Sequence, residues 1–258
     1  MLGAHCENPR LQHWKALKRV LGYLKTTQEK GITYRRRLVP YATNVIDEPK
    51  KIEYEPDRLP DHTVIYSTDS NWAGSVKARK SRECIIATVN GGTVYSSSRQ
   101  SPGKTDLSSS EAEYRAAAAA ADTACGTPNW AKLVESAGII RARKESAREN
   151  DGLRQFMKEI GFGQTRATPI LEDNEAAIKL AKNPIKAGKT KHIDVHHHFI
   201  RQSIKNNDIV MVPVDTTLNP ADLGTKSLGR TKFERFRDHV LGDRIIDHSG
   251  LILAEWGC

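Results

Sequence analysis

The chain has few cysteines and no long apolar run. Its 258 residues include four cysteines, none of them in a Cys-x-x-Cys pair, so neither a disulfide framework nor a zinc site is expected. No apolar run reaches the roughly 18 residues of a membrane-spanning helix, so we expect no membrane partner. Residues 1–14 lack the apolar stretch and small-residue cleavage site of a signal peptide, so we expect a protein that is not secreted.

The charge balance of the chain is basic. Forty Lys and Arg residues stand against 31 Asp and Glu residues, which gives a formal net charge of +9. A basic balance attracts polyanions such as nucleic acid, although many basic proteins bind none. The hydrophobic share of 38% and the length allow one large domain, or one domain with an attached fragment.

The first quarter of the chain differs from the rest. Residues 8–26 are expected to form an amphipathic helix, because large apolar side chains recur at steps of three and four. These side chains are Trp14, Leu17, Leu21 and Leu24. Several prolines and mixed charges in residues 27–61 are typical of a linker.

Strand-like segments begin at residue 62. "HTVIYSTDS" has the β-branched and aromatic content of a strand, and "ECIIATV" and "TVYSSS" flank an Asn-Gly-Gly turn that favours a hairpin. We therefore predict three antiparallel strands over residues 62–98. An alanine-rich helix follows, and then helices alternate with the strands "TPILED" and "DIVMVPVD". This order predicts an α/β domain over residues 62–242, with a mixed sheet covered by helices, and a tail over 243–258.

Two glutamates stand at the start of the alanine-rich helix, in "SSSEAEY". If Ser108 is the N-cap, Glu111 completes a capping box; if Ser110 is the N-cap, Glu113 does. Acidic residues in a first turn also suit the helix dipole. This window alone therefore favours a structural role and leaves the choice of cap open.

Carboxylates recur at the ends of the predicted elements. Asp69 ends the first strand, Asp173 ends the strand "TPILED" and starts the next helix, Asp222 begins a helix, and Glu111 or Glu113 begins the alanine-rich helix. Each alone is commonly a cap or turn residue. If they converge, they offer the hard oxygen ligands that Mg²⁺ prefers, as two-metal phosphoryl-transfer sites do.

Several segments together carry a family resemblance. They are "YSTDSNWAGSVKARKS", "VYSSSRQS", "LSSSEAEYRAAA", "EDNEAAIKLAKNP", "KTKHIDVHHHFIR" and "VPVDTTLNPADLGTKSL". In this order they resemble the ribonuclease H domain of copia-type LTR retrotransposon polyproteins. The helix "HWKALKRVLGYLK" is similar to the segment that joins the reverse transcriptase to that domain, so residues 1–61 resemble a reverse transcriptase remnant with a linker.

The resemblance implies a ribonuclease H-like fold, with a mixed five-stranded sheet flanked by helices and an N-terminal helical fragment. It implies an endoribonuclease that cleaves the RNA strand of RNA–DNA hybrids, using two Mg²⁺ ions that Mn²⁺ is able to replace. The catalytic and metal-binding residues carried over are Asp69, Glu113, Asp173 and Asp222. Glu113 is preferred to Glu111 by the resemblance, and two residues that point about 200° apart on a helix cannot share one site.

The implied partners are the RNA–DNA hybrid and other parts of the polyprotein, including the polymerase domain. Four basic residues are candidate phosphate contacts, with a solvated surface role equally open for each. They are Lys77, Arg79, Lys80 and Arg99. The implied location is the cytoplasm, within a virus-like particle, with the nucleus as an alternative. No YxDD-like run is present, so we do not expect polymerisation by this chain alone.

Two departures from the family pattern bear on the expected function. Asn71 stands where the family commonly has a second Asp. Gly126 and Pro128 interrupt the alanine-rich helix, and residues at about 123–152 are predicted to be an insertion, because Pro and Gly break helices. The alternative function is therefore a catalytically dead remnant that keeps the fold and at most binds nucleic acid.

Overall fold

The computed structural model describes residues 6, 8–34, 62–72, 81–100, 108–125, 152–182 and 194–243. The chain divides into two compact units, residues 1–32 and residues 33–258. Residue 61 of the expected boundary at 61 and 62, the tail from 244 onward, and residues 126–151 of the expected insertion lie outside the described residues. The expected domain limits therefore remain predictions.

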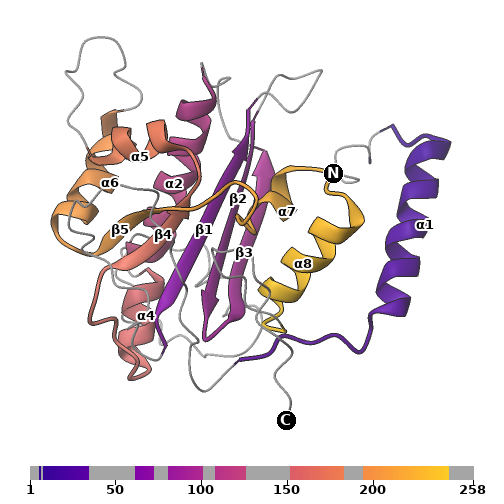
Figure 1. The fold of residues 1–258 in the computed structure, drawn as a ribbon, viewed down its shortest axis with the longest axis horizontal. Helices are drawn as coiled ribbons and strands as arrows, with labels where there is room; N and C mark the ends of the chain where they lie inside the picture. The colour runs from indigo at the N-terminus through magenta and orange to yellow at the C-terminus, as the bar shows by residue number, and fades with distance from the viewer. Residues whose placement is uncertain are drawn as a thin grey trace. The chain divides into compact units, whose positions relative to one another are not determined.

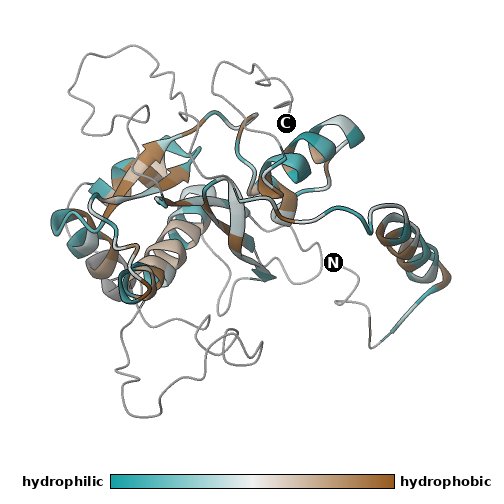
Figure 2. Ribbon diagram, turned by 90° about the horizontal axis from the view of Figure 1, so that it is seen from below, coloured by the Kyte–Doolittle hydropathy of each residue, from teal (hydrophilic) through white to brown (hydrophobic). Residues whose placement is uncertain are grey.

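The described residues of the first unit form one helix, α1 (Leu11–Thr26). None of its residues is buried, and its apolar stripe, drawn brown against teal in Figure 2, is solvent-exposed. The stripe is formed by Leu11, Trp14, Leu17, Val20, Leu21 and Leu24. The helix that the apolar periodicity predicted is therefore present, with an apolar face.

The second unit is built on one five-stranded mixed sheet (Figure 1). Its strands are β1 (Val64–Asn71), β2 (Arg82–Val89), β3 (Gly92–Gln100), β4 (Thr168–Glu172) and β5 (Ile209–Pro213). The order across the sheet is β3-β2-β1-β4-β5. The first three strands are antiparallel, and β4 and β5 run parallel to β1.

The predicted hairpin joins β2 to β3. Its turn residues Asn90 and Gly91 have φ angles of 51° and 81°. Both lie in the left-handed region that a two-residue Asn-Gly turn requires, and this backbone twist matches that of the flanking strands. The local sequence therefore specified the pairing of these two strands.

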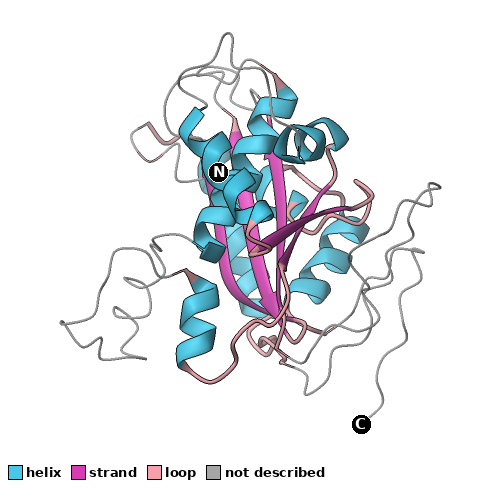
Figure 3. Ribbon diagram, turned by 90° about the vertical axis from the view of Figure 1, so that its left-hand side faces the viewer, coloured by secondary structure: helices cyan, strands magenta, loops and turns pink. Residues whose placement is uncertain are grey.

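Helices cover both faces of the sheet (Figure 3). They are α2 (Ser109–Cys125), α4 (Leu153–Glu159), α5 (Glu175–Lys182), α6 (Asp194–Lys205), α7 (Asp222–Thr225) and α8 (Arg230–Val240). On one face α2 packs against β1 and contacts α4, α5 and α6. On the other face α7 contacts β1, β2 and β3. The expected fold class, a mixed five-stranded sheet flanked by helices, is confirmed.

Alternation along β1 divides the core into two parts. Tyr66 faces the cluster that includes α2, and Ile65 faces a second cluster with Phe236 of α8. The buried face of α2 is mostly alanine, for example Ala117 and Ala121, which are completely buried. Alanine favours the helix and lets its backbone approach the sheet closely.

The two described ends of the expected insertion lie side by side. A Cβ atom added to Gly152 would stand 2.4 Å from the carbonyl oxygen of Ala124, near the last residue of α2, Cys125. Only glycine tolerates so close a backbone approach. Helix α4 therefore packs against α2, although residues 126–151 separate the two helices in the sequence.

Helix α7 is held tightly against the sheet. Ser98 Oγ on β3 donates to the carbonyl of Gly224 at 2.6 Å, and Asn71 Nδ2 on β1 donates to that of Thr225 at 3.3 Å. The buried Asn219 donates to the carbonyl of Thr68 at 2.7 Å and accepts from the backbone N–H of Ala221 at 3.1 Å. These contacts fix the first residue of α7 beside β1.

Replacing Gly224 by alanine is expected to lower the free energy of unfolding by about 1 to 3 kcal/mol, because the added carbon would stand 2.4 Å from Cys84 Sγ. Chemical denaturation measures the change. The matched control is Gly229→Ala, since nothing lies within 4 Å of a carbon added there. Equal stability of the two variants would contradict the close packing of α7 on β2.

Candidate metal centre

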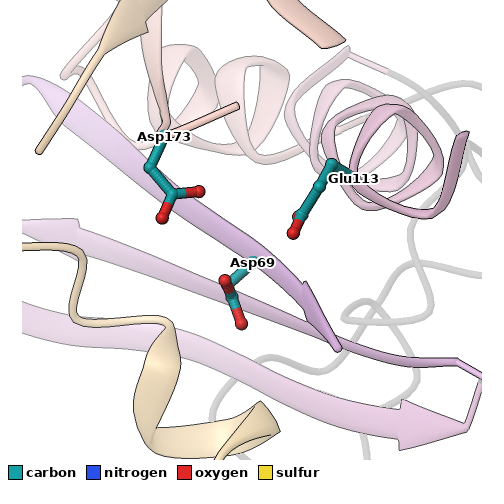
Figure 4. A group of neighbouring side chains, drawn as sticks. All are labelled: Asp69, Glu113 and Asp173. Atoms are coloured by element: carbon teal, nitrogen blue, oxygen red, sulfur yellow. The ribbon is translucent and has the colours of Figure 1, made fainter. Parts of the chain in front are cut away.

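Three of the four expected carboxylates converge at one edge of the sheet. Asp69 lies near the end of β1, Asp173 directly follows β4, and Glu113 lies early in α2. One oxygen of each lies within 4.8 Å of the other two, and Figure 4 shows the side chains pointing toward one another. Because β1 and β4 are parallel neighbours, their carboxyl ends meet at the same edge.

The three carboxylates are shielded from water to different degrees. Asp69 is fully buried, Glu113 is buried and Asp173 is half-buried. Glu113 Oε2 is buried with no hydrogen-bond partner. Burying a polar oxygen without a partner costs free energy, and a bound cation would offset that cost by pairing with the oxygen.

The surroundings of the three carboxyl groups disfavour their simultaneous ionisation. Burial raises the pKa of Glu113 to about 10, and repulsion from Glu172, Asp69 and Asp173 adds to that effect. Burial likewise raises the pKa of Asp69 and that of Asp173. Without a cation, the cluster therefore favours protonated carboxyl groups.

A further carboxylate, Glu172, lies behind this cluster. It is fully buried, and its oxygens accept hydrogen bonds from Thr68 Oγ1 at 2.9 Å and from the backbone N–H of Asn174 at 3.1 Å. Burial, followed by repulsion from Asp173, raises its pKa well above the usual value. Sequence reasoning did not single it out, although a glutamate ending the wholly buried strand β4 was a usable signal.

Asp222, the fourth expected ligand, is engaged by lysines. Lys226 Nζ lies 2.6 Å from Asp222 Oδ1 and 3.0 Å from Asp69 Oδ1, and Lys232 Nζ lies 2.6 Å from Asp222 Oδ2. Thr225 Oγ1 donates to the other oxygen of Asp69. Asp222 is thus joined to the cluster through Lys226, and neither lysine nor Thr225 was anticipated from the sequence.

The ammonium group of Lys226 is stabilised by its two carboxylate partners. Partial burial lowers its pKa, but hydrogen bonds to Asp222 and Asp69 outweigh that effect and raise the pKa overall. The only feature of the sequence that indicated this ion pair is the spacing of four residues between Asp222 and Lys226, because residues four apart on a helix are neighbours.

The two glutamates of α2 have separate environments. The backbone N–H of Glu111 donates to Ser108 Oγ at 3.1 Å, which makes Ser108 the N-cap. Glu113 instead lies in the carboxylate cluster. The choice of cap that the sequence left open is therefore decided in favour of Ser108.

Of the four expected phosphate contacts, only Arg99 falls within the described residues. It lies on β3, and its Nε donates to Glu83 Oε1 at 2.5 Å, while 48% of its side chain is exposed. Lys77, Arg79 and Lys80 lie outside the described residues. A role of these four residues in binding nucleic acid remains a prediction. Among the described helices, none combines the length and the apolar character needed to cross a membrane.

Comparisons with known proteins show similarity to transposon polyproteins. No family model matches it. It is 28% identical over 234 residues to the "Retrovirus-related Pol polyprotein from transposon TNT 1-94" of Nicotiana tabacum, covering 91% of this chain and 14% of that protein. It is also 28% identical over 232 residues to the corresponding polyprotein from transposon RE1 of Arabidopsis thaliana, covering 90% and 12%. The chain thus spans less than a sixth of the length of these relatives.

Among solved structures, the chain is similar to the N-terminal RNase H domain of rv2228c from Mycobacterium tuberculosis, which was fused to maltose-binding protein. The TM-score is 0.35 and the identity 12%, and the match covers 69% of this chain and 98% of that one. Over about nine tenths of its length, the chain is homologous to retrovirus-related Pol polyproteins of plant transposons.

Proposed function

We propose that the chain is a metal-dependent ribonuclease H-type endonuclease of a retrotransposon polyprotein, which cleaves the RNA strand of RNA–DNA hybrids. The observation that carries the proposal is the cluster of Asp69, Glu113 and Asp173, whose oxygens lie within 4.8 Å of one another. The homology to Pol polyproteins supports the same assignment.

The cluster fits a divalent cation on chemical grounds. Asp69, Glu113 and Asp173 would hold it, since carboxylate oxygens are the ligands that Mg²⁺ and Mn²⁺ prefer. The partnerless Glu113 Oε2 is a free ligand atom at the centre. Burial is the main cause that raises the pKa of each of the three carboxyl groups, and a bound cation would favour their charged, ligating form.

When bound, a divalent cation activates water and stabilises the charge that develops on the phosphodiester. The chain's own residues fix the geometry. Thr225 and Lys226 orient the two oxygens of Asp69, and α2 presents Glu113 from a helix packed on β1. Thr68 and Asn174 hold Glu172 behind the site. Pre-positioned ligands of this kind reduce the reorganisation needed during reaction.

The substrate class follows from charge and from the resemblance. A net charge of +9 favours a polyanion. A hybrid-specific enzyme must distinguish RNA from DNA through the 2′-hydroxyl and the shape of the minor groove. The polymerase part of the same polyprotein is the proposed partner, because the relatives are several times longer than this chain.

The deciding experiment is cleavage of an RNA–DNA hybrid labelled on the RNA strand. The wild-type chain is expected to cut it with Mg²⁺ and not with EDTA, and Asp173→Asn is expected to cut at least about a hundredfold more slowly. The control is Glu175→Gln, two residues away, whose side chain is 80% exposed and pairs with Lys179; its rate should stay within about twofold of wild type. If the wild type shows no metal-dependent cutting, the proposed activity is wrong.

The second candidate is a remnant that binds nucleic acid without cleaving it. The interruption at Gly126 and Pro128 is the feature that favours it. The adjacency of Ala124 and Gly152 weighs against it, because α2 and α4 pack together despite the interruption. Binding of the hybrid without cleavage, in the same experiment, would favour the remnant.

A further inference from the structure

A lysine ammonium group lies between two of the four expected metal ligands. Lys226 Nζ is 3.0 Å from Asp69 Oδ1 and 2.6 Å from Asp222 Oδ1. These distances are those of charge-assisted hydrogen bonds, and they connect carboxylates from β1 and α7. In a two-metal arrangement, a cation that bridges Asp69 and Asp222 would compete with this ammonium group for the same oxygens.

Asp222 has no oxygen free for another cation. Lys232 Nζ lies 2.6 Å from its Oδ2, so each oxygen faces one ammonium group. Asp69 faces Lys226 at one oxygen, but its other oxygen accepts only from the neutral hydroxyl of Thr225, so that oxygen is still able to ligate a cation. Glu113 differs, since its Oε2 is buried with no partner. Lysine ammonium groups therefore already neutralise Asp222, whereas Glu113 Oε2 has no positively charged partner.

The position of Lys226 is fixed by its surroundings. It directly follows α7, which is tied to β3 through Ser98 and to β1 through Asn71. Asp222 lies one helical turn before Lys226, and Lys232 approaches Asp222 from α8. A side chain with two carboxylate partners, directly after a helix anchored to two strands, has a defined location.

We infer that Lys226 supplies the second positive charge of this centre. The chain then binds one divalent cation, at Asp69, Glu113 and Asp173, and Asp222 positions Lys226 instead of ligating metal. This inference rests on the proposed function, and it replaces the two-ion arrangement of the resemblance with one ion and one ammonium group. The ammonium group is also placed to face a phosphodiester oxyanion bound at the same cluster.

The test is a count of Mn²⁺ ions bound by the full chain without nucleic acid, from the electron paramagnetic resonance signal of free Mn²⁺. The wild type is expected to bind one ion, and Lys226→Met two, because the substitution frees oxygens of Asp69 and Asp222. Asp222→Asn is expected to bind one ion with an affinity within about threefold of wild type. The control Lys232→Met should still bind one, since Lys226 remains in place.

Other outcomes overturn the inference in distinguishable ways. Two ions in the wild type, with one lost in Asp222→Asn, would show that Asp222 is a ligand, and would leave the proposed nuclease intact. One ion in a folded Lys226→Met would show that this lysine does not exclude a second cation. No bound ion in the wild type would overturn the proposed metal centre and this inference together. If Lys226→Met does not fold, the counts for the wild type and Asp222→Asn still decide.

Discussion

Replacing Glu113 by glutamine is expected to reduce Mg²⁺-dependent cleavage of an RNA–DNA hybrid by about a hundredfold to a thousandfold. The substitution removes the carboxylate whose Oε2 is the partnerless atom of the cluster. Charge stabilisation by a bound metal is worth several kcal/mol, and each 1.36 kcal/mol corresponds to about a factor of ten in rate. Single-turnover cleavage at saturating hybrid measures the effect, because it separates the chemical step from binding and release.

The matched control is Glu111→Gln, two residues earlier on the same helix. Glutamine serves in a capping box as glutamate does, and the backbone N–H of Glu111 would still donate to Ser108 Oγ. Its cleavage rate should stay within about twofold of wild type. If the two substitutions reduce the rate equally, the assignment of Glu113 to the metal centre is wrong.

The metal-free protein is expected to lose stability as pH rises, and Glu113 is expected to cause much of that loss. Burial, together with repulsion from Glu172, Asp69 and Asp173, raises the pKa of Glu113 from 4.5 to about 10, although Lys226 partly offsets this effect. The folded state therefore binds the proton more tightly than the unfolded state. The stability that this proton provides is complete below about pH 4.5 and declines as pH rises toward about 10.

Thermal or urea unfolding in EDTA between pH 5 and pH 8 tests this prediction. Glu113→Gln should become more stable relative to wild type across that interval, by about 2 to 4 kcal/mol at pH 8, since each pH unit contributes at most about 1.4 kcal/mol. Saturating Mg²⁺ should stabilise the wild type more than the variant, because a ligand that binds only the folded state adds to its stability. A difference between the two proteins that is independent of pH would contradict the prediction.

Much of the fold was accessible from local patterns. The segment "HTVIYSTDS" became β1, and the Asn-Gly turn joins β2 to β3 as predicted. Apolar periodicity located α1, and alternating helices and strands indicated a mixed sheet. These features follow from side-chain shape and turn chemistry within a few residues, so a single sequence contains them.

The candidate site was accessible only in part. Sequence reasoning placed Asp69, Asp173 and Asp222 at element ends, and the resemblance separated Glu113 from Glu111. It missed Glu172, Thr225 and the two lysines at Asp222, because nothing in the local pattern shows which side chains face one another across the fold. The helix cap was also undecided, since Ser108 and Ser110 satisfy the same local rule.

The sequence by itself determined the elements, the hairpin and the residue types from which a metal centre is built. Only the tertiary structure decided their partners. Asp69 and Lys226 are 157 residues apart in the chain, and their 3.0 Å contact exists because α7 is anchored on β1 and β3. Such a contact depends on the packing of the whole sheet and not on local preference. The burial that raises the pKa of Glu113 likewise arises only when α2 packs on β1.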